Sequence, residues 1–190
     1  MTKHRCDWPG NDPLMIDYHD NEWGTPVHDD RKWFEFLVLD TFQAGLSWRT
    51  ILHKRENFRA AFDQFDYEKI ALYDEDKVEA LLRDTGIIRN RLKVQATIVN
   101  ARCFIQLQQD EGSFDAFVWN LVDGKPVVNH WENAQEVPAT SPLSDELSKI
   151  LKKKGFKFVG STTCYAFLQA AGVVNDHLVG CFRFEELNLL

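Results

Sequence analysis

Several features are scarce in this 190-residue chain. It has no apolar run of transmembrane length and no hydrophobic leader near Met1, which argues against a membrane span and a secretory signal. It has four cysteines, which in an intracellular protein are expected as thiols or metal ligands and not as disulfides. No strand-like alternation, internal repeat or low-complexity tract stands out. We therefore expect a soluble cytoplasmic protein of all-α architecture.

Positive charge is also in deficit. Lysine and arginine number 22 against 29 acidic residues, for a net charge of -7, so a uniform electrostatic grip on nucleic acid is excluded, whereas a local basic face is not. Basic side chains gather at two glycine turns, namely Arg83, Arg89, Arg91 and Lys93 near Gly86, and Lys149, Lys152, Lys153, Lys154 and Lys157 near Gly155. Such turns can point backbone N–H groups at phosphates. Equally, lysines near a helix end can simply complement its dipole.

Apolar residues recur mostly at helical spacing. The sequence predicts helices over 30–40, 47–64 and 75–84, a long helix from the end of an interruption at 86–90 to about Gln109, and helices over 113–121, from Ser144 to the Gly155 turn, and over 161–171. Residues 1–29, 123–142 and 173–182 are expected to be irregular or loops. The length fits one domain or two small interlocked lobes.

The segment from Asp40 to Trp48 links two of these expected helices. Gly45 can supply the turn and Ser47 the next N-cap. Because Phe42, Leu46 and Trp48 accompany Asp40, part of the corner is expected to line a concave surface. From composition alone, the favoured interpretation of Asp40 is a surface residue at a helix C-terminus, and that of Tyr18, Trp8, Trp23 and Trp48 is core residues. The content of 6 Trp and 14 Phe nevertheless exceeds what core packing needs, and flat rings often line ligand surfaces.

Four candidate metal ligands lie at opposite ends of the chain. Cys6 and His19 are near the start, and His177 and Cys181 form a His-x3-Cys pattern near the end. Two cysteines and two histidines make a closed tetrahedral shell that suits a structural Zn²⁺ and would tie the termini together. The alternative is an unliganded helix face. Cys103 and Cys164 are interpreted as buried thiols.

A series of motifs, in order and with spacing, resembles the DNA-3-methyladenine glycosylase I family. The motifs are Cys6-x-Trp8, Asp12-Pro13, Tyr18-His19-Asp20-x-Glu22-Trp23-Gly24, Gln43-Ala44-Gly45-Leu46-Ser47-Trp48, Lys54-Arg55-Glu56-Asn57, Gly86-Ile87-Ile88-Arg89, Lys152-Lys153-x-Gly155-Phe156-Lys157-Phe158-Val159-Gly160 and Val174-Asn175-Asp176-His177-x-Val179-Gly180-Cys181. The resemblance covers nearly the whole chain. It implies a single glycosylase domain over 1–190 with two interlocked helical lobes. A helix-hairpin-helix element is expected at about 75–105, and a zinc ion joins residues 1–24 to 173–182.

The resemblance also implies roles for individual residues. The zinc ligands are Cys6, His19, His177 and Cys181; the residues that bind the base are Tyr18, Trp48, Trp8, Trp23 and Phe42; Asp40 is the catalytic candidate; and Leu46, Gly86, Ile88, Arg89 and Lys93 contact DNA, with Leu46 as the wedge that replaces the flipped base. The expected enzyme is a monofunctional N-glycosyl hydrolase that excises 3-methyladenine from double-stranded alkylated DNA. It would act as a monomer in the bacterial cytoplasm, at the nucleoid, without membrane partners.

Three departures from the family pattern involve four positions. Asp40 stands where the family usually has glutamate, Thr41-Phe42 where Gly-Gln is common, and Met15 where a pocket tyrosine is common. A site built around one hydrogen-bond length can lose large factors when that bond is unmade. These departures motivate a second hypothesis, a protein that binds modified bases without turnover or with altered specificity. A third is a zinc-stapled interaction module without a nucleic-acid role.

Overall fold

The computed structural model describes residues 3–189, which form eleven α-helices and one short two-stranded sheet. The helices are α1 (Pro13–Asn21), α2 (Asp30–Gln43), α3 (Trp48–His53), α4 (Arg55–Ala61), α5 (Tyr67–Ile70), α6 (Glu75–Arg83), α7 (Arg91–Glu111), α8 (Phe114–Asn120), α9 (Pro142–Lys153), α10 (Ser161–Ala170) and α11 (Phe182–Asn188). Two 3₁₀ turns span Asp63–Phe65 and Ala134–Glu136. None of the described helices is both long and apolar enough to cross a bilayer.

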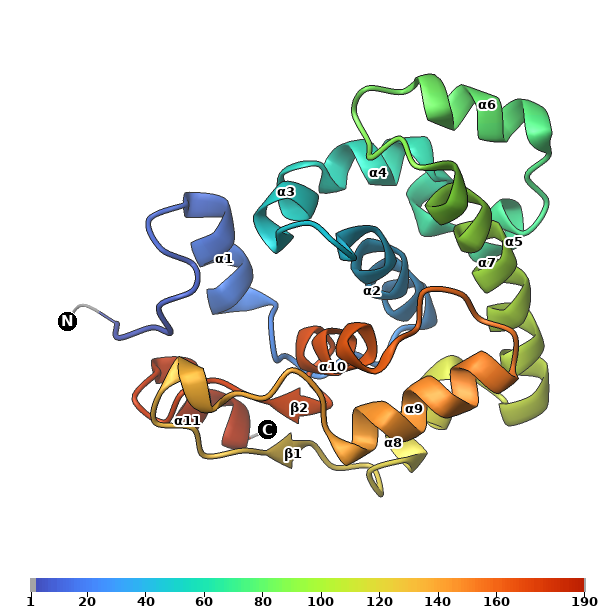
Figure 1. The fold of residues 1–190 in the computed structure, drawn as a ribbon. Coiled ribbons are helices and arrows are strands. Elements are labelled where there is room, and N and C mark those ends of the chain that lie inside the picture. The colour runs from blue at the N-terminus through green and yellow to red at the C-terminus, as the bar shows by residue number, and fades with distance from the viewer. Residues whose placement is uncertain (1–2, 190) are drawn as a thin grey trace.

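Helix α2 forms the centre of the molecule, and α3, α7, α8 and α10 pack around it (Figure 1). Ten of its fourteen residues are buried, from Trp33 to Phe42, as expected for a helix that is apolar on most faces. Asp29 caps its start by accepting a 2.8 Å hydrogen bond from the Lys32 amide. Gly45, with φ +80°, follows the helix and lets the chain turn away.

The predicted helical regions are largely confirmed. Ser47, Asp74 and Ser113 cap α3, α6 and α8 through their side-chain oxygens. The region expected as one helix over 47–64 is instead divided into α3, α4 and a 3₁₀ turn, whose residues 63–65 all have positive φ.

Several predicted boundaries were wrong. Residues 1–29 contain α1, because Asp12 accepts hydrogen bonds from the Leu14 and Met15 amides and Pro13 occupies the first helical position. Helix α9 begins at Pro142 and not at Ser144, since Ser141 is the N-cap. Short elements too brief to show periodicity were also missed, namely α5, α11 and the parallel pair β1 (Val127–Val128) and β2 (Val174–Asn175).

Helices α6 and α7 form a hairpin whose turn, 84–90, docks onto the preceding helices. Lys54 Nζ donates hydrogen bonds to the carbonyl oxygens of Thr85 and Gly86, at 3.2 and 3.1 Å. Asn57 Nδ2 donates to Gly86 O at 3.3 Å. A Cβ on Gly86 would approach Asn57 Cβ to 3.1 Å, so a larger residue here would require Asn57 to shift.

The two ends of the described chain meet. In Figure 1 the N-terminal segment with α1 and the C-terminal α11 lie on the same side of the molecule. The Phe182 amide donates to His4 O at 2.9 Å, and His4 Nδ1 lies 2.8 Å from Gly180 O. This junction brings together the terminal motifs that contain the candidate metal ligands.

Candidate functional site

A cavity of about 390 Å³ opens between α1, α2 and α10. Its lining residues come from both ends and the middle of the chain: Cys6, Asp7, Trp8, Tyr18, Trp23, Asp40, Gln43, Trp48, Ala134, Val137, Ala166, Gln169, Ala170, Asp176 and Leu178. This volume falls in the range of small-molecule sites. Five residues predicted to bind the base or to act on it, Trp8, Tyr18, Trp23, Asp40 and Trp48, are therefore brought to one cavity.

Aromatic rings make up much of its wall. The rings of Tyr18 and Trp48 lie 5.0 Å apart between centroids, and Trp8 is 6.2 Å from Tyr18 and 5.2 Å from Trp23. Tyr18 is buried, whereas Trp8 is 37% exposed, so the wall extends from the interior to the surface. Such a set offers flat apolar faces to a planar ligand.

Polar groups in this wall lack protein partners. Asp40 is 4% exposed, and its Oδ2 atom is enclosed without a hydrogen bond from any described residue, as is Nε1 of Trp48. Burial raises the pKa of Asp40 well above its usual range. Burial, followed by the nearby charge of Asp40, likewise raises the pKa of Tyr18. An unmade hydrogen bond in a buried place is unfavourable, so this acceptor and this donor are suited to a ligand.

Two predicted site residues are corrected by the structure. Phe42 does not line the cavity: it is fully buried, with its ring 4.8 Å from that of Phe58 and 5.9 Å from that of Phe62. Since α2 turns Phe42 into the core while Asp40 and Gln43 reach the cavity, it cannot bind a base there. Lys93 is not a free DNA contact. Its Nζ is directed inward and donates to Phe42 O at 2.8 Å and to Ala44 O at 2.6 Å.

The other predicted DNA contacts lie at or near the surface. Leu46 is 41% exposed at the tip of the turn after α2. Arg89 is exposed, while Gly86 and Ile88 are half-buried in the α6–α7 turn. These positions leave Leu46 and Arg89 accessible to a large ligand.

A largely buried ion-pair network lies next in the chain to the cavity residue Trp23, through Glu22. Arg55 donates to both oxygens of Glu22 at 2.5 and 2.7 Å and to Glu35 at 2.5 Å, and Lys32 and Arg59 complete the pairing. Burial alone would raise the pKa of Glu22, but the hydrogen bonds and charge of Arg55, with Lys32, lower it to about 2. The network joins the end of α1 to α2 and α4.

The four predicted metal ligands form one buried cluster. Cys6, His19, His177 and Cys181 are all buried, and their ligand atoms lie within 4.8 Å of one another. The Cys181 Sγ atom is 3.5 Å from both His19 Nε2 and His177 Nδ1. Contacts with Cys6 and then the two histidines lower the pKa of Cys181, which favours the thiolate form that binds metals.

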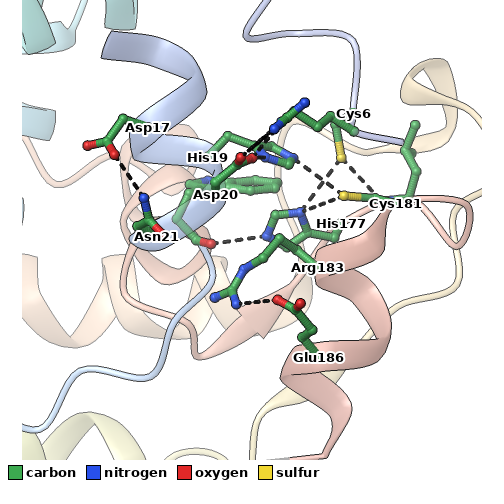
Figure 2. A network of polar contacts seen from close by, with 12 residues as sticks. Cys6, Asp17, His19, Asp20, Asn21, His177, Cys181, Arg183 and Glu186 are labelled. Carbon is green, nitrogen blue, oxygen red and sulfur yellow. Dashed lines mark hydrogen bonds and ion pairs between the residues drawn. The ribbon is translucent and has the colours of Figure 1, made fainter. Parts of the chain in front are cut away.

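The second nitrogen of each histidine is also held (Figure 2). His19 Nδ1 lies 2.8 Å from Asp20 Oδ1, and Arg5 clamps that carboxylate through two nitrogens. His177 Nε2 lies 3.0 Å from Trp23 O. Partners of this kind direct the remaining nitrogen of a metal-binding histidine inward. The cluster could therefore hold a metal ion.

Sequence reasoning missed Gln169 and Asp176 as cavity residues. Asp176 belongs to the Val174–Cys181 motif but was not given a role, and Gln169 lies in α10 outside every quoted motif. The adjacency of Asp176 to His177 was an available signal for one of them; the sequence offered none for Gln169.

The fold and cavity define a helical protein with an aromatic pocket that contains a carboxyl group, an arrangement suited to a planar ring with polar edge groups. Comparison with known proteins makes this specific. Residues 8–184 match the methyladenine glycosylase family model. Over 177 residues the chain is 54% identical to DNA-3-methyladenine glycosylase 1 of Escherichia coli (strain K12), covering 93% of this chain and 95% of that protein. The protein belongs to the DNA-3-methyladenine glycosylase I family.

Solved structures agree. A crystal structure of 3-methyladenine DNA glycosylase I is 55% identical, with a TM-score of 0.92, covering 94% of this chain and 98% of that one. The enzyme from Staphylococcus aureus, studied for 3-methyladenine recognition, is 37% identical with a TM-score of 0.91, covering 94% and 95%. A further family structure, 36% identical with a TM-score of 0.91 and covering 94% and 96%, is a complex with 3-methyladenine.

Proposed function

We propose that this protein excises 3-methyladenine from alkylated DNA by hydrolysing the N-glycosidic bond. Its family membership and the activity named for its relatives support the proposal. The single observation that carries it is that Asp40 and Trp48, which both line the aromatic cavity, each have a buried polar atom, Oδ2 and Nε1, without a hydrogen-bond partner among the described residues. A flat base with donors and acceptors on its edge matches these groups.

The residue types fit a reaction that needs binding more than acid catalysis. A purine methylated at N3 is cationic while attached to the sugar and departs as a neutral base, so its bond is already weak. The cavity must extract and hold the base, for which stacking contributes about 1–3 kcal/mol per base. The ring of Trp48 favours a cation over its face. The same cation favours the ionised form of Asp40, against the effect of burial.

The surface residues suggest how DNA could be held. Leu46 is the candidate wedge for the gap left by a flipped base, and the α6–α7 turn with Gly86, Ile88 and Arg89 is the candidate backbone contact. In this proposal α6 and α7 form the helix-hairpin-helix element. Lys93 supports this arrangement from inside, since it ties the start of α7 to the turn that carries Leu46.

We also propose that the cluster of Cys6, His19, His177 and Cys181 holds one structural Zn²⁺. Two thiols and two imidazoles suit this ion, and four protein ligands leave no open position for water or substrate. The ion would stabilise the junction of the chain ends. Trp23 connects it to the cavity, since its carbonyl contacts His177 and its ring lines the wall.

A second candidate function is recognition of modified bases without turnover. It is favoured by Asp40, whose side chain is one methylene shorter than the glutamate usual in the family. The two functions are separated by chromatography of bases released from alkylated duplex DNA by wild type, Asp40→Glu and Asp40→Ala.

We expect wild type to release 3-methyladenine and Asp40→Ala to be about ten- to a hundredfold slower, the loss of one buried hydrogen bond to the base. Release by Asp40→Glu but not by wild type would instead support the binding protein. If wild type and Asp40→Ala release the base equally fast, Asp40 has no part in the reaction.

A further inference from the structure

The far wall of the cavity contains a buried carboxylate, Asp176, that accepts four hydrogen bonds. Its Oδ1 accepts from Asn129 Nδ2 and Trp131 Nε1, each at 2.7 Å. Its Oδ2 accepts from the Tyr165 hydroxyl and from Gln169 Nε2, the latter at 2.7 Å. Asp176 is 2% exposed. All four partners donate their hydrogen bonds to the two carboxyl oxygens of Asp176.

This carboxylate determines which way the Gln169 amide faces. If the amide were rotated by half a turn, its oxygen would meet Oδ2, and two acceptors would repel each other. The NH₂ group therefore faces Asp176. The opposite atom, Oε1, receives no hydrogen bond from residues 3–189 and is not among the fully enclosed unpartnered atoms. It is thus an accessible acceptor on a side chain that lines the cavity.

Gln169 also lies on the wall that faces Asp40. Ala166, one turn earlier on the same face of α10, borders a smaller hollow together with Asp40 and Gln43. On its other side, Gln169 O accepts a 3.1 Å hydrogen bond from the Gly24 amide, next to Trp23. Gln169 therefore lines the same cavity as Asp40 and the aromatic residues, on the α10 side.

We propose that Gln169 is a specificity-determining residue, whose Oε1 accepts a hydrogen bond from the exocyclic amino group of the flipped purine, with Asp176 as the positioning residue that fixes this orientation. An adenine presents a donor at its 6-position, whereas a 6-oxopurine presents an acceptor. The fixed oxygen accordingly selects 6-aminopurines and repels 6-oxopurines. The inference rests on the proposed function and assigns its base preference.

The test compares two free bases that differ at the 6-position, 3-methyladenine and 3-methylhypoxanthine. Their affinities are measured through quenching of the cavity tryptophans for wild type, Gln169→Met and Asp176→Asn. The methionine variant keeps the length of the side chain and removes its oxygen. In Asp176→Asn the new amide can donate to Oε1, so the Gln169 amide can turn its NH₂ group to the cavity.

Gln106→Met is the matched control, because Gln106 also donates to an aspartate, Asp110, at 3.0 Å, but on the exposed face of α7. Thermal unfolding and metal content are recorded for every variant. Release of 3-methyladenine from alkylated duplex DNA is measured in parallel, so that the proposed activity is assessed apart from the base preference.

We expect Gln169→Met to lower the preference for 3-methyladenine about three- to tenfold, the worth of one hydrogen bond. Asp176→Asn should lower it further, because a donor then faces a donor, and Gln106→Met should leave it unchanged. A purely structural Gln169 would lower unfolding temperature in both variants and leave the ratio of affinities as in wild type, which would overturn the inference. A wild type that neither binds nor releases 3-methyladenine would overturn the proposed function itself, and this inference with it.

Discussion

At the scale of single residues, the buried carboxyl group of Asp40 is unfavourable for folding but suited to binding a ligand. It is buried against the cavity with Oδ2 unpartnered, an arrangement that stability alone does not favour. Natural proteins retain such groups where a ligand uses them. The proton on this residue should therefore affect the stability of the free protein.

The first prediction concerns Asp40→Asn and pH. Since burial raises the folded-state pKa of Asp40, the folded protein holds this proton more tightly than the unfolded chain, where aspartate titrates near pH ~3.9. The stability from Asp40 is fully present below that pH and is lost as pH rises through the folded-state pKa. Asparagine cannot lose a proton. The free energy of unfolding of Asp40→Asn relative to wild type should therefore increase by about 1.4 kcal/mol per pH unit between the unfolded-state pKa and the folded-state pKa.

Urea unfolding of both proteins at a series of pH values, starting near the unfolded-state pKa of about 3.9 and rising from there, measures this difference. Asp17→Asn, at an exposed position of α1, is the control and should follow wild type. Parallel curves for wild type and Asp40→Asn would show that Asp40 ionises in the folded protein as easily as in the unfolded chain.

At the scale of elements, Lys93 fastens two helices together. It lies in the first turn of α7, is 6% exposed, and donates to two carbonyl oxygens at the end of α2. Those carbonyls are among the groups that a helix C-terminus leaves without partners. Burial lowers the pKa of Lys93, in keeping with a lysine removed from solvent.

The second prediction is that Lys93→Met destabilises the protein by about 1–3 kcal/mol, because two buried carbonyls lose their donor. Base release should also slow, since the turn with Leu46 loses its attachment. Chemical denaturation and base release measure the two effects, and Lys125→Met, at an exposed position between α8 and β1 and outside both basic clusters, is the control. Unchanged stability, with a salt dependence of DNA binding reduced by about one phosphate contact, would instead restore Lys93 as a DNA contact.

The third prediction concerns Arg55, which joins α1, α2 and α4. Arg55→Leu leaves two largely buried carboxylates, Glu22 and Glu35, with only part of their pairing. Removing one partner of a buried ion pair destabilises by about 3 kcal/mol, and Lys32 and Arg59 should offset a share of this. The lowered pKa of Glu22, about 2, means that its stabilisation is present above the ordinary carboxyl range and is lost as pH falls toward about 2.

Urea unfolding near neutral pH and during acid titration measures the effect of Arg55→Leu. Arg91→Leu removes an exposed arginine with two acidic partners, Glu75 and Glu79, and should change stability little because exposed pairs contribute little. If Arg55→Leu and Arg91→Leu lower the free energy of unfolding equally, burial does not strengthen the ion pairs of Arg55.

At the scale of the whole molecule, the metal cluster joins residues far apart in the chain. Cys6 and His177 are separated by 171 positions, and closing so long a loop favours the folded state mainly by restricting the unfolded one. A metal ion in this cluster would therefore act as a clamp on the complete fold. It would also fix Trp23, which borders both the cluster and the cavity.

The fourth prediction is that the native protein contains one zinc ion and that Cys181→Ser loses it with a lower unfolding temperature. Strong chelators should produce the same change in wild type, because ligand removal takes binding free energy from folding. Elemental analysis and thermal unfolding measure both. Cys103→Ser, outside the cluster, is the control. Native protein without zinc, or Cys181→Ser with full metal content and stability, would refute the assignment.

The sequence by itself determined the helical class, most helix positions, five of the cavity residues and the four members of the metal cluster. Helical periodicity depends on local side-chain spacing, which can be read directly from the sequence. The residues of the cavity and the metal cluster were identified from motifs that occur in the same order as in the family. The 47–64 region and the start of α9 differed only in details of breaks and caps.

The tertiary structure alone decided which way particular side chains point. Phe42 was predicted to contact a base and Lys93 to contact DNA, yet both side chains point into the protein. The reason is that packing, and not local sequence, fixes how α2 and α7 are rotated against their neighbours. The same is true of Gln169, which no motif marked. The NH₂ group of its amide faces Asp176, because the carboxyl oxygen there accepts a hydrogen bond from it. Only the tertiary fold brings these two residues together.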